Sequence, residues 1–74
     1  MEKEQVKKII EETLQKMNCG DISFLEDKDG SLTVVFNCKE ITSFVASITG
    51  WTYSGIQLNS NGEHQYKIDF KKLK

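Results

Sequence analysis

The chain has few of the residues and patterns that point to a specific chemistry. It contains no arginine, so all 10 of its basic residues are lysine. Because the planar guanidinium group is best suited to bidentate contacts with guanine or phosphate, this absence disfavours sequence-specific nucleic-acid recognition. The single histidine has no serine or aspartate at a spacing typical of a hydrolase. We therefore expect a protein that is not an enzyme.

Long apolar runs are missing as well. No stretch approaches the roughly 18 apolar residues that a membrane-spanning helix needs, and the charged opening MEKE does not resemble a signal peptide. Two cysteines are too few for the disulfide framework of a small secreted domain, so both are expected to be free thiols. These features predict a cytoplasmic protein that needs no membrane and no cofactor.

Size limits the chain to one modest core. With 74 residues, of which 38% are hydrophobic, we expect a single small α+β domain spanning residues 1–74. So small a domain is only marginally stable, which makes association with itself or with another protein a natural source of further buried area. The net charge of -1 creates no strong field toward nucleic acid or an anionic membrane.

The clearest pattern is a unit that occurs twice: an amphipathic helix that ends at glycine, then two strands joined by a glycine turn. The first helix is expected to end at Gly20, and its apolar positions recur at helical spacing, at Val6, Ile9, Ile10, Leu14 and Met17. The strands that follow cover about residues 21–26 and 31–37, and Asp29-Gly30 forms their turn.

The second unit begins with a predicted helix that follows Asn37 and ends at Gly50. Asn37, with Glu40 three residues later, resembles a capping box. Apolar residues then recur at helical spacing, at Ile41, Phe44, Val45 and Ile48. The outward positions of this helix are small and uncharged, whereas the first helix carries many charges.

The strands of the second unit are less regular. A bulge at Ser54-Gly55 is needed to bring the apolar side chains of the third strand to one face. These side chains are Trp51, Tyr53, Ile56 and Leu58. Asn61-Gly62 forms the last turn, and residues 64–70 alternate as the fourth strand.

The order helix, strand, strand, helix, strand, strand predicts a two-layer α+β fold, αββαββ. We expect a four-stranded antiparallel sheet in the order 3-4-2-1, with both helices on one face and a right-handed crossover from strand two to strand three. Moving the first strand of a ferredoxin-like plait to the C-terminus gives the same order. The predicted fold is therefore a circularly permuted ferredoxin-like plait.

This topology brings Cys19, Cys38 and His64 to one end of the sheet. Cys38 also falls in the first turn of the predicted second helix, where the helix dipole favours a thiolate. A thiol or metal site, with Asp21 or Glu63 as further ligands, is one hypothesis. Its alternative is two small buried hydrophobic residues, since no CxxC or HxxxH spacing is present and zinc needs four ligands.

Two binding hypotheses remain. Nucleic-acid binding of low sequence specificity would use the basic C-terminus, with Lys67, Lys71, Lys72 and Lys74. The leading hypothesis is a non-catalytic protein-interaction or regulatory module that binds a protein partner or itself as a homodimer. Its contact patch would consist of Ser43, Ala46, Ser47, Trp51 and Tyr53. The alternative is that Trp51 simply seals the core.

The outer face of the first hairpin has one further feature. Among the side chains expected to point away from the helices there, only Leu25 and Val35 are apolar. This face is expected to meet solvent or a partner. It carries no aromatic residue, which disfavours base stacking on the sheet.

Overall fold

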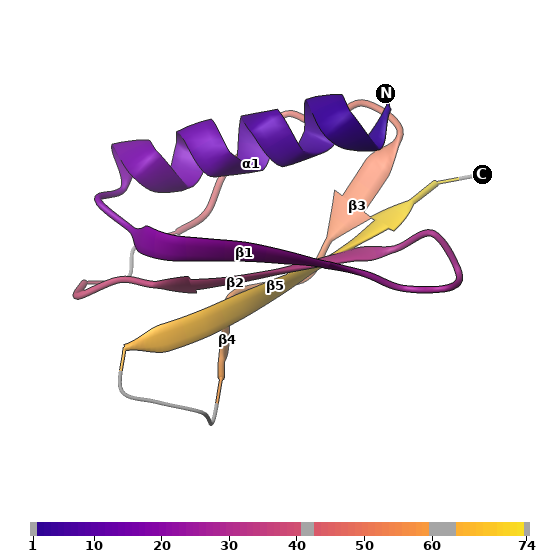
Figure 1. Cartoon of the computed structure of the whole chain (residues 1–74). Coiled ribbons are helices and arrows are strands. Elements are labelled where there is room, and N and C mark those ends of the chain that lie inside the picture. Colours follow the sequence, from indigo (N-terminus) through magenta and orange to yellow (C-terminus); the bar gives the residue numbers. More distant parts are fainter. Residues whose placement is uncertain (1, 41–42, 60–63, 74) are drawn as a thin grey trace.

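The computed structural model describes residues 2–40, 43–59 and 64–73, in which one helix packs on an antiparallel sheet (Figure 1). The helix, α1, spans Lys3–Lys16 and lies across one face of the sheet. The five strands are β1 (Gly20–Glu26), β2 (Leu32–Asn37), β3 (Trp51–Tyr53), β4 (Gln57–Leu58) and β5 (Gln65–Lys72). The fold therefore belongs to the α+β class.

Some sequence predictions concern residues outside these ranges. They are the turn at Asn61-Gly62, the apolar position Ile41, and the candidate site residues Glu63 and Lys74.

The amphipathic pattern of α1 is what holds the helix on the sheet. Glu2 and Gln5 form a capping box at its N-terminus. Val6, Ile10 and Leu14 have no exposed surface, and their spacing of four residues places them on one stripe. The prediction of an amphipathic first helix is confirmed.

The strands follow the order β1-β2-β5-β3, with β4 paired to β5 beyond the end of β3. β1 and β2 form the predicted hairpin, in which Gly30 takes a positive φ of 88° at the turn. β2 pairs along its whole length with β5, from Leu32 opposite Phe70 to Asn37 opposite Gln65. β2 and β5 are thus the central strands, and β1 forms one edge.

The prediction of a second helix is wrong, because residues 43–48 form an irregular crossover. Phe44 and Ile48 are buried and Ala46 is half-buried, whereas Val45 is 76% exposed. Phe44 and Ile48 are four residues apart, which suits a helix, but the same positions also suit alternation with a period of two. Isoleucine, valine, serine and threonine have low helix propensity, so the segment favours the second pattern.

The prediction of a four-stranded sheet is also wrong, because the expected third strand is divided into β3 and β4. Tyr53 lies opposite Phe70 and Gln57 opposite Lys67, so four steps along this edge match three along β5. The extra residue falls within 54–56, at the predicted bulge. A permuted ferredoxin-like plait has two helices over four strands, so that assignment is corrected to one helix over five strands.

The core lies between the sheet and a second layer, which α1 and the crossover form together (Figure 1). α1 runs above β1, and the crossover passes behind it to reach β3. The ring of Phe44 packs edge-on against Tyr53 and Phe70, at centroid distances of 5.3 and 5.8 Å. The crossover therefore covers the half of the sheet that a second helix would cover.

Candidate functional site

The end of α1 places Cys19 beside the core. Asn18 has a positive φ of 61° and donates its N–H to the Gln15 carbonyl at 3.0 Å. The Cys19 N–H donates to the Leu14 carbonyl, also at 3.0 Å. This is the Schellman pattern of helix termination, with asparagine in the left-handed position that glycine usually takes. The predicted stop at Gly20 is wrong, since Gly20 already belongs to β1.

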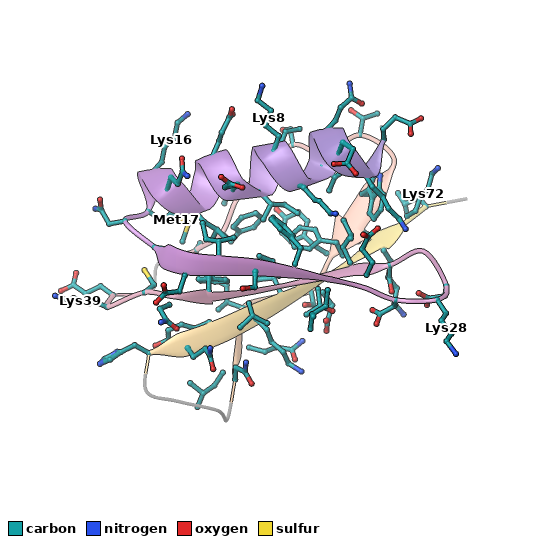
Figure 2. The ribbon with its side chains drawn as sticks, in the orientation of Figure 1. Lys8, Lys16, Met17, Lys28, Lys39 and Lys72 are labelled. Carbon is teal, nitrogen blue, oxygen red and sulfur yellow. The ribbon has the colours of Figure 1, made fainter. Side chains whose placement is uncertain are left out.

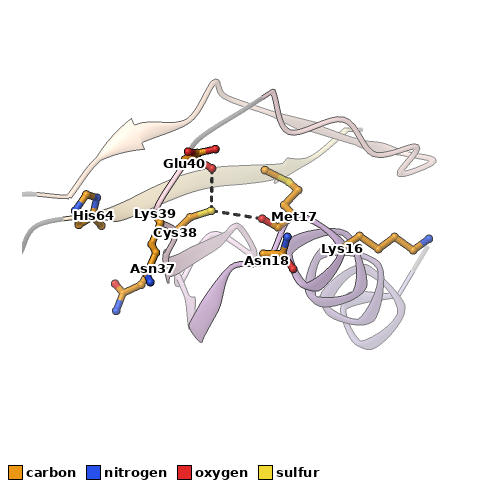
Figure 3. A pocket seen from close by; sticks show the side chains of 8 residues that line it. All are labelled: Lys16, Met17, Asn18, Asn37, Cys38, Lys39, Glu40 and His64. Carbon is orange, nitrogen blue, oxygen red and sulfur yellow. Dashed lines mark hydrogen bonds between the residues drawn. The ribbon is translucent and has the colours of Figure 1, made fainter.

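Cys38 reaches the same place from the end of β2. Its N–H donates to the His64 carbonyl at 2.9 Å, which continues the pairing of β2 with β5. The Cys38 Sγ lies 3.2 Å from the Glu40 carbonyl oxygen and 3.6 Å from the Met17 carbonyl oxygen, and its one S–H group is shared between these two acceptors (Figure 3). The Cys19 Sγ lies 3.9 Å from the same Met17 oxygen. The two thiols therefore meet over one carbonyl group at the end of α1.

Both thiols are enclosed, with Cys19 8% exposed and Cys38 4% exposed. Burial first, and then the hydrogen bond and charge of Cys38, raise the pKa of Cys19 from its ordinary 9.0 to about 12. A thiol with so high a pKa stays protonated at neutral pH, whereas the nucleophile and the metal ligand are the thiolate. The helix expected to favour a Cys38 thiolate is not formed. The arrangement favours two buried thiols, of which Cys19 stays protonated and unreactive.

An open hollow lies beside Cys38 at this end of the sheet, and His64 is one of the residues that line it. It has a volume of about 730 Å³ and is lined by Lys16, Met17, Asn18, Asn37, Cys38, Lys39, Glu40 and His64 (Figure 3). The main-chain carbonyl of His64 accepts the hydrogen bond from the Cys38 N–H. The exposed side chain of His64 points away from the end of α1. Asp21 accepts a 2.8 Å hydrogen bond from Asn37 Nδ2. Within the described ranges, no three His, Cys, Asp or Glu side chains are placed to share a metal ion.

The predicted protein-contact patch lies only partly at the surface. Trp51 is 6% exposed and belongs to the core, and half-buried Tyr53 packs against it. Ala46 is also half-buried. Ser43 and Ser47 are exposed, but they lie on the irregular crossover and share no helix face. The position of Trp51 is that of a residue that seals the core.

The C-terminal lysines are divided between the two faces of the sheet. Lys67 and Lys71 lie on the open face, with Asp69 between them on the same strand. Lys72 lies on the other face, because it is paired with buried Trp51. Figure 2 shows the labelled lysines spread over the helix, the hairpin tip and opposite ends of the molecule. This distribution weakens the case for lysine-driven nucleic-acid binding.

The free edge of β1 is a site that the sequence analysis does not single out. In the described part of the chain, β1 pairs with β2 on one side and with no strand on the other. Antiparallel pairs alternate between residues that exchange hydrogen bonds and residues whose main-chain groups point away. The hairpin closes with a 2.9 Å bond from the Asp27 N–H to the Ser31 carbonyl. Asp27 and Leu25 therefore direct their main-chain groups toward β2, and the main-chain groups of Phe24 and Glu26 point away from β2.

The bonds on the other side of β2 give the same alternation. Cys38 bonds to His64 across to β5, so every second residue back from Cys38, including Val34, bonds to β5. Val34 lies opposite Phe24 in the hairpin. Since the main-chain groups of Val34 are used by β5, those of Phe24 face the free edge.

A groove runs between α1 and this edge. It has a volume of about 460 Å³, and its lining consists of Glu4, Lys7, Lys8, Glu11, Glu12, Gln15 and Phe24. The Lys7 ammonium lies 6.0 Å from the centre of the Phe24 ring. Lys3 and Lys7 each lie 3.3 Å from a carboxylate oxygen of Glu26. These contacts, with that of Lys7 the larger, lower the pKa of Glu26 and turn its carboxylate toward α1.

Leu25 lies between the two residues with outward main-chain groups. It points to the open face of the sheet opposite Thr33, and it is 57% exposed. The sequence signal for it is an apolar residue at a position where a solvated face normally carries a polar one. This exposed leucine points to a binding surface only because β1 is an edge strand.

Two regions therefore stand out, an enclosed pair of thiols at one end of the sheet and a free strand edge with a groove beside it. No helix within the described ranges is long and apolar enough to cross a membrane. The chain matches no protein-family model, no curated protein and no solved structure.

Proposed function

We propose that this chain is a non-catalytic protein-interaction module that binds an extended protein segment along the free edge of β1. The observation that carries the proposal is that the N–H and C=O groups of Phe24 and Glu26 point away from β2. An added strand satisfies such groups, and main-chain hydrogen bonds of this kind supply the affinity in strand addition.

The two faces of β1 offer contacts for the side chains of the bound segment. On one face, the groove beside Phe24 receives an apolar side chain between charged residues of α1. On the other face, Leu25 presents exposed apolar surface. Because side chains of an extended segment alternate in direction, successive residues contact the groove and Leu25 in turn. We expect bound segments to alternate apolar residues with residues of both charges.

The pair of thiols fits a structural role in such a module. Cys19 and Cys38 are free and buried, and the raised pKa of Cys19 keeps its thiol protonated. As part of the proposal we place the module in the cytoplasm, because free thiols persist where glutathione and thioredoxin keep them reduced.

Selection from a phage-displayed library of random nonapeptides tests the proposal. We expect selected peptides to shift the NMR signals of residues 22–26 and of the α1 residues that line the groove. The signals of β3 and β4, at the other edge of the sheet, should not move. Selected peptides whose shifts lie away from β1 would contradict the proposal.

A sharper version of this test removes one outward donor without changing a side chain. The chain can be assembled by chemical ligation at Cys19 with an N-methyl group on Phe24, and the unmethylated ligation product is the control. Peptide affinity should fall at least about tenfold, because one hydrogen bond is lost and the methyl group blocks the edge. Equal affinity for both products, or no selected peptide at all, contradicts strand addition.

A further inference from the structure

The free edge of β1 has the properties of a strand that pairs with itself, an inference that rests on the function proposed above and names its partner. Two copies of β1 related by a two-fold axis pair antiparallel. Hydrogen bonds form only where outward-facing residues oppose each other. Since Phe24 and Glu26 are these residues, the axis passes through Phe24, Leu25 or Glu26.

The acidic residues bear on the choice among these three registers. An axis at Glu26 sets the two Glu26 side chains against each other, and an axis at Phe24 sets Asp27 against Asp21. Like charges directly opposite each other destabilise a strand pair. An axis at Leu25 opposes Phe24 to Glu26, so no like charges meet inside the strand.

The like-charged pair of the Leu25 register occurs twice by symmetry and joins Asp21 of β1 to a residue beyond the end of the strand. There Asp21 comes opposite Asp29, which lies in the hairpin turn. The Ser31 hydroxyl donates to the Asp29 carboxylate at 2.6 Å, and the Ser31 N–H donates to it at 3.0 Å. These bonds hold the Asp29 carboxylate inside its own turn, and the Asp27 carboxylate lies 3.0 Å from the same hydroxyl, so the acidic residues at the strand ends do not decide between the Leu25 and Phe24 registers. That choice rests on Leu25, which opposes its own copy only when the axis passes through it.

An axis at Leu25 also buries the exposed leucine. Opposed residues that do not exchange hydrogen bonds have the closest Cα spacing of an antiparallel pair, about 4.5 Å. Leu25 takes this position, so two side chains that are 57% exposed in one copy contact each other on the open face. Phe24 and Glu26 of each copy then donate and accept main-chain bonds with Glu26 and Phe24 of the other.

The charge that would normally prevent such pairing is neutralised within each copy. Charged side chains on edge strands usually keep other strands away. β1 carries two such charges. Asp21 accepts a 2.8 Å hydrogen bond from Asn37, and Lys3 and Lys7 hold the Glu26 carboxylate against α1 at 3.3 Å. We therefore infer that the segment bound at the edge is β1 of a second copy, paired antiparallel about a two-fold axis through Leu25.

Sedimentation equilibrium of the full chain tests this inference, with concentrations up to about 1 mM, the range of weak association. We expect a dimer for the wild type. Leu25→Lys should weaken dimerisation about a hundredfold, because it replaces an apolar contact with two like charges directly opposite each other. Val45→Lys is the matched control, since Val45 is exposed on the crossover, and its dimerisation should equal that of the wild type.

The register is measured separately, in a dimer of one isotope-labelled and one unlabelled copy. Pairing through Leu25 gives a nuclear Overhauser contact between the Leu25 Hα atoms of the two copies. A wild type that stays monomeric overturns the inference, as does a dimer that lacks this contact or that Leu25→Lys leaves intact. A monomer that still binds selected nonapeptides at β1 retains the proposed function and loses only the self-pairing.

Discussion

The main-chain nitrogen of Ala46 lies 3.3 Å from the hydroxyl oxygen of Tyr53, and the Ala46 carbonyl lies 3.5 Å from the same atom. One side chain of β3 thus takes up both main-chain groups of a residue in the irregular crossover. We expect Tyr53→Phe to lower the free energy of unfolding by about 1–2 kcal/mol. Urea denaturation followed by fluorescence measures the change.

Tyr66→Phe is the matched control for this prediction. Tyr66 is half-buried beside Phe36, at a centroid distance of 6.1 Å, and within the described ranges its hydroxyl has no hydrogen bond. Its loss of stability should stay below about 0.5 kcal/mol. An equal loss in both variants would show that the Tyr53 hydroxyl does not anchor the crossover.

Gly30→Ala should destabilise the first hairpin by about 1 kcal/mol, because Gly30 has a positive φ of 88° that an alanine side chain disfavours. No atom lies within 4 Å of an added Cβ, so the cost comes from the backbone alone. Gly55 has the same open space without a positive φ, so Gly55→Ala should cost nothing. Urea denaturation of the two variants separates these outcomes, and equal losses would contradict the assignment.

Stability should fall at alkaline pH because of Cys19. Its pKa rises from 9.0 to about 12 on folding, so the folded state favours the protonated thiol. This stabilisation is complete below the unfolded pKa and is lost as the pH rises from about 9 toward 12. Cys19→Ala removes the titrating group, so the stability difference between wild type and variant should shrink over this range. A constant difference in urea midpoints across the pH series would refute the prediction.

Lys7→Met should raise the pKa of Glu26, because the Lys7 ammonium is the larger of the two contacts that lower it. Carboxyl NMR titration of Glu26 measures the shift. Lys8→Met is the control, since Lys8 points away from the sheet above α1 (Figure 2). In the wild type this contact stabilises the folded state fully above the ordinary pKa of Glu26. The stabilisation is lost as the pH falls through the lowered pKa of Glu26 in the folded state. If Lys7→Met leaves the pKa of Glu26 unchanged, the Lys7 ammonium does not contact the carboxylate and lies in solvent.

The segments with a strong repeat are predictable from the sequence, and the crossover is not. In α1, Ile9 and Met17 also pack against the core beside Val6, Ile10 and Leu14, and these mixed spacings of one, three and four residues fit only a helix. Phe44 and Ile48 fit both a helix and an alternating chain. The contact that distinguishes the two comes from Tyr53, seven residues after Ala46, and a local pattern does not contain it.

The candidate sites, too, can be predicted from the sequence only in part. Strand direction alone brings Cys19 and Cys38 to one end, but the raised pKa of Cys19 depends on burial, which needs the packed structure. Leu25 is visible in the sequence as an apolar residue on the outer face of the hairpin. The groove beside Phe24 depends on where α1 lies relative to β1, and that position comes from packing between layers.

The break between β3 and β4 limits how far the sheet can grow. Strands with intact edges on both sides add copies without end, as in cross-β fibrils. Here the edge opposite β1 offers a strand of three residues and a strand of two, separated by the extra residue within 54–56. A third copy would find no continuous row of main-chain groups there, so the self-pairing proposed for β1 would end at a closed pair without polymerisation.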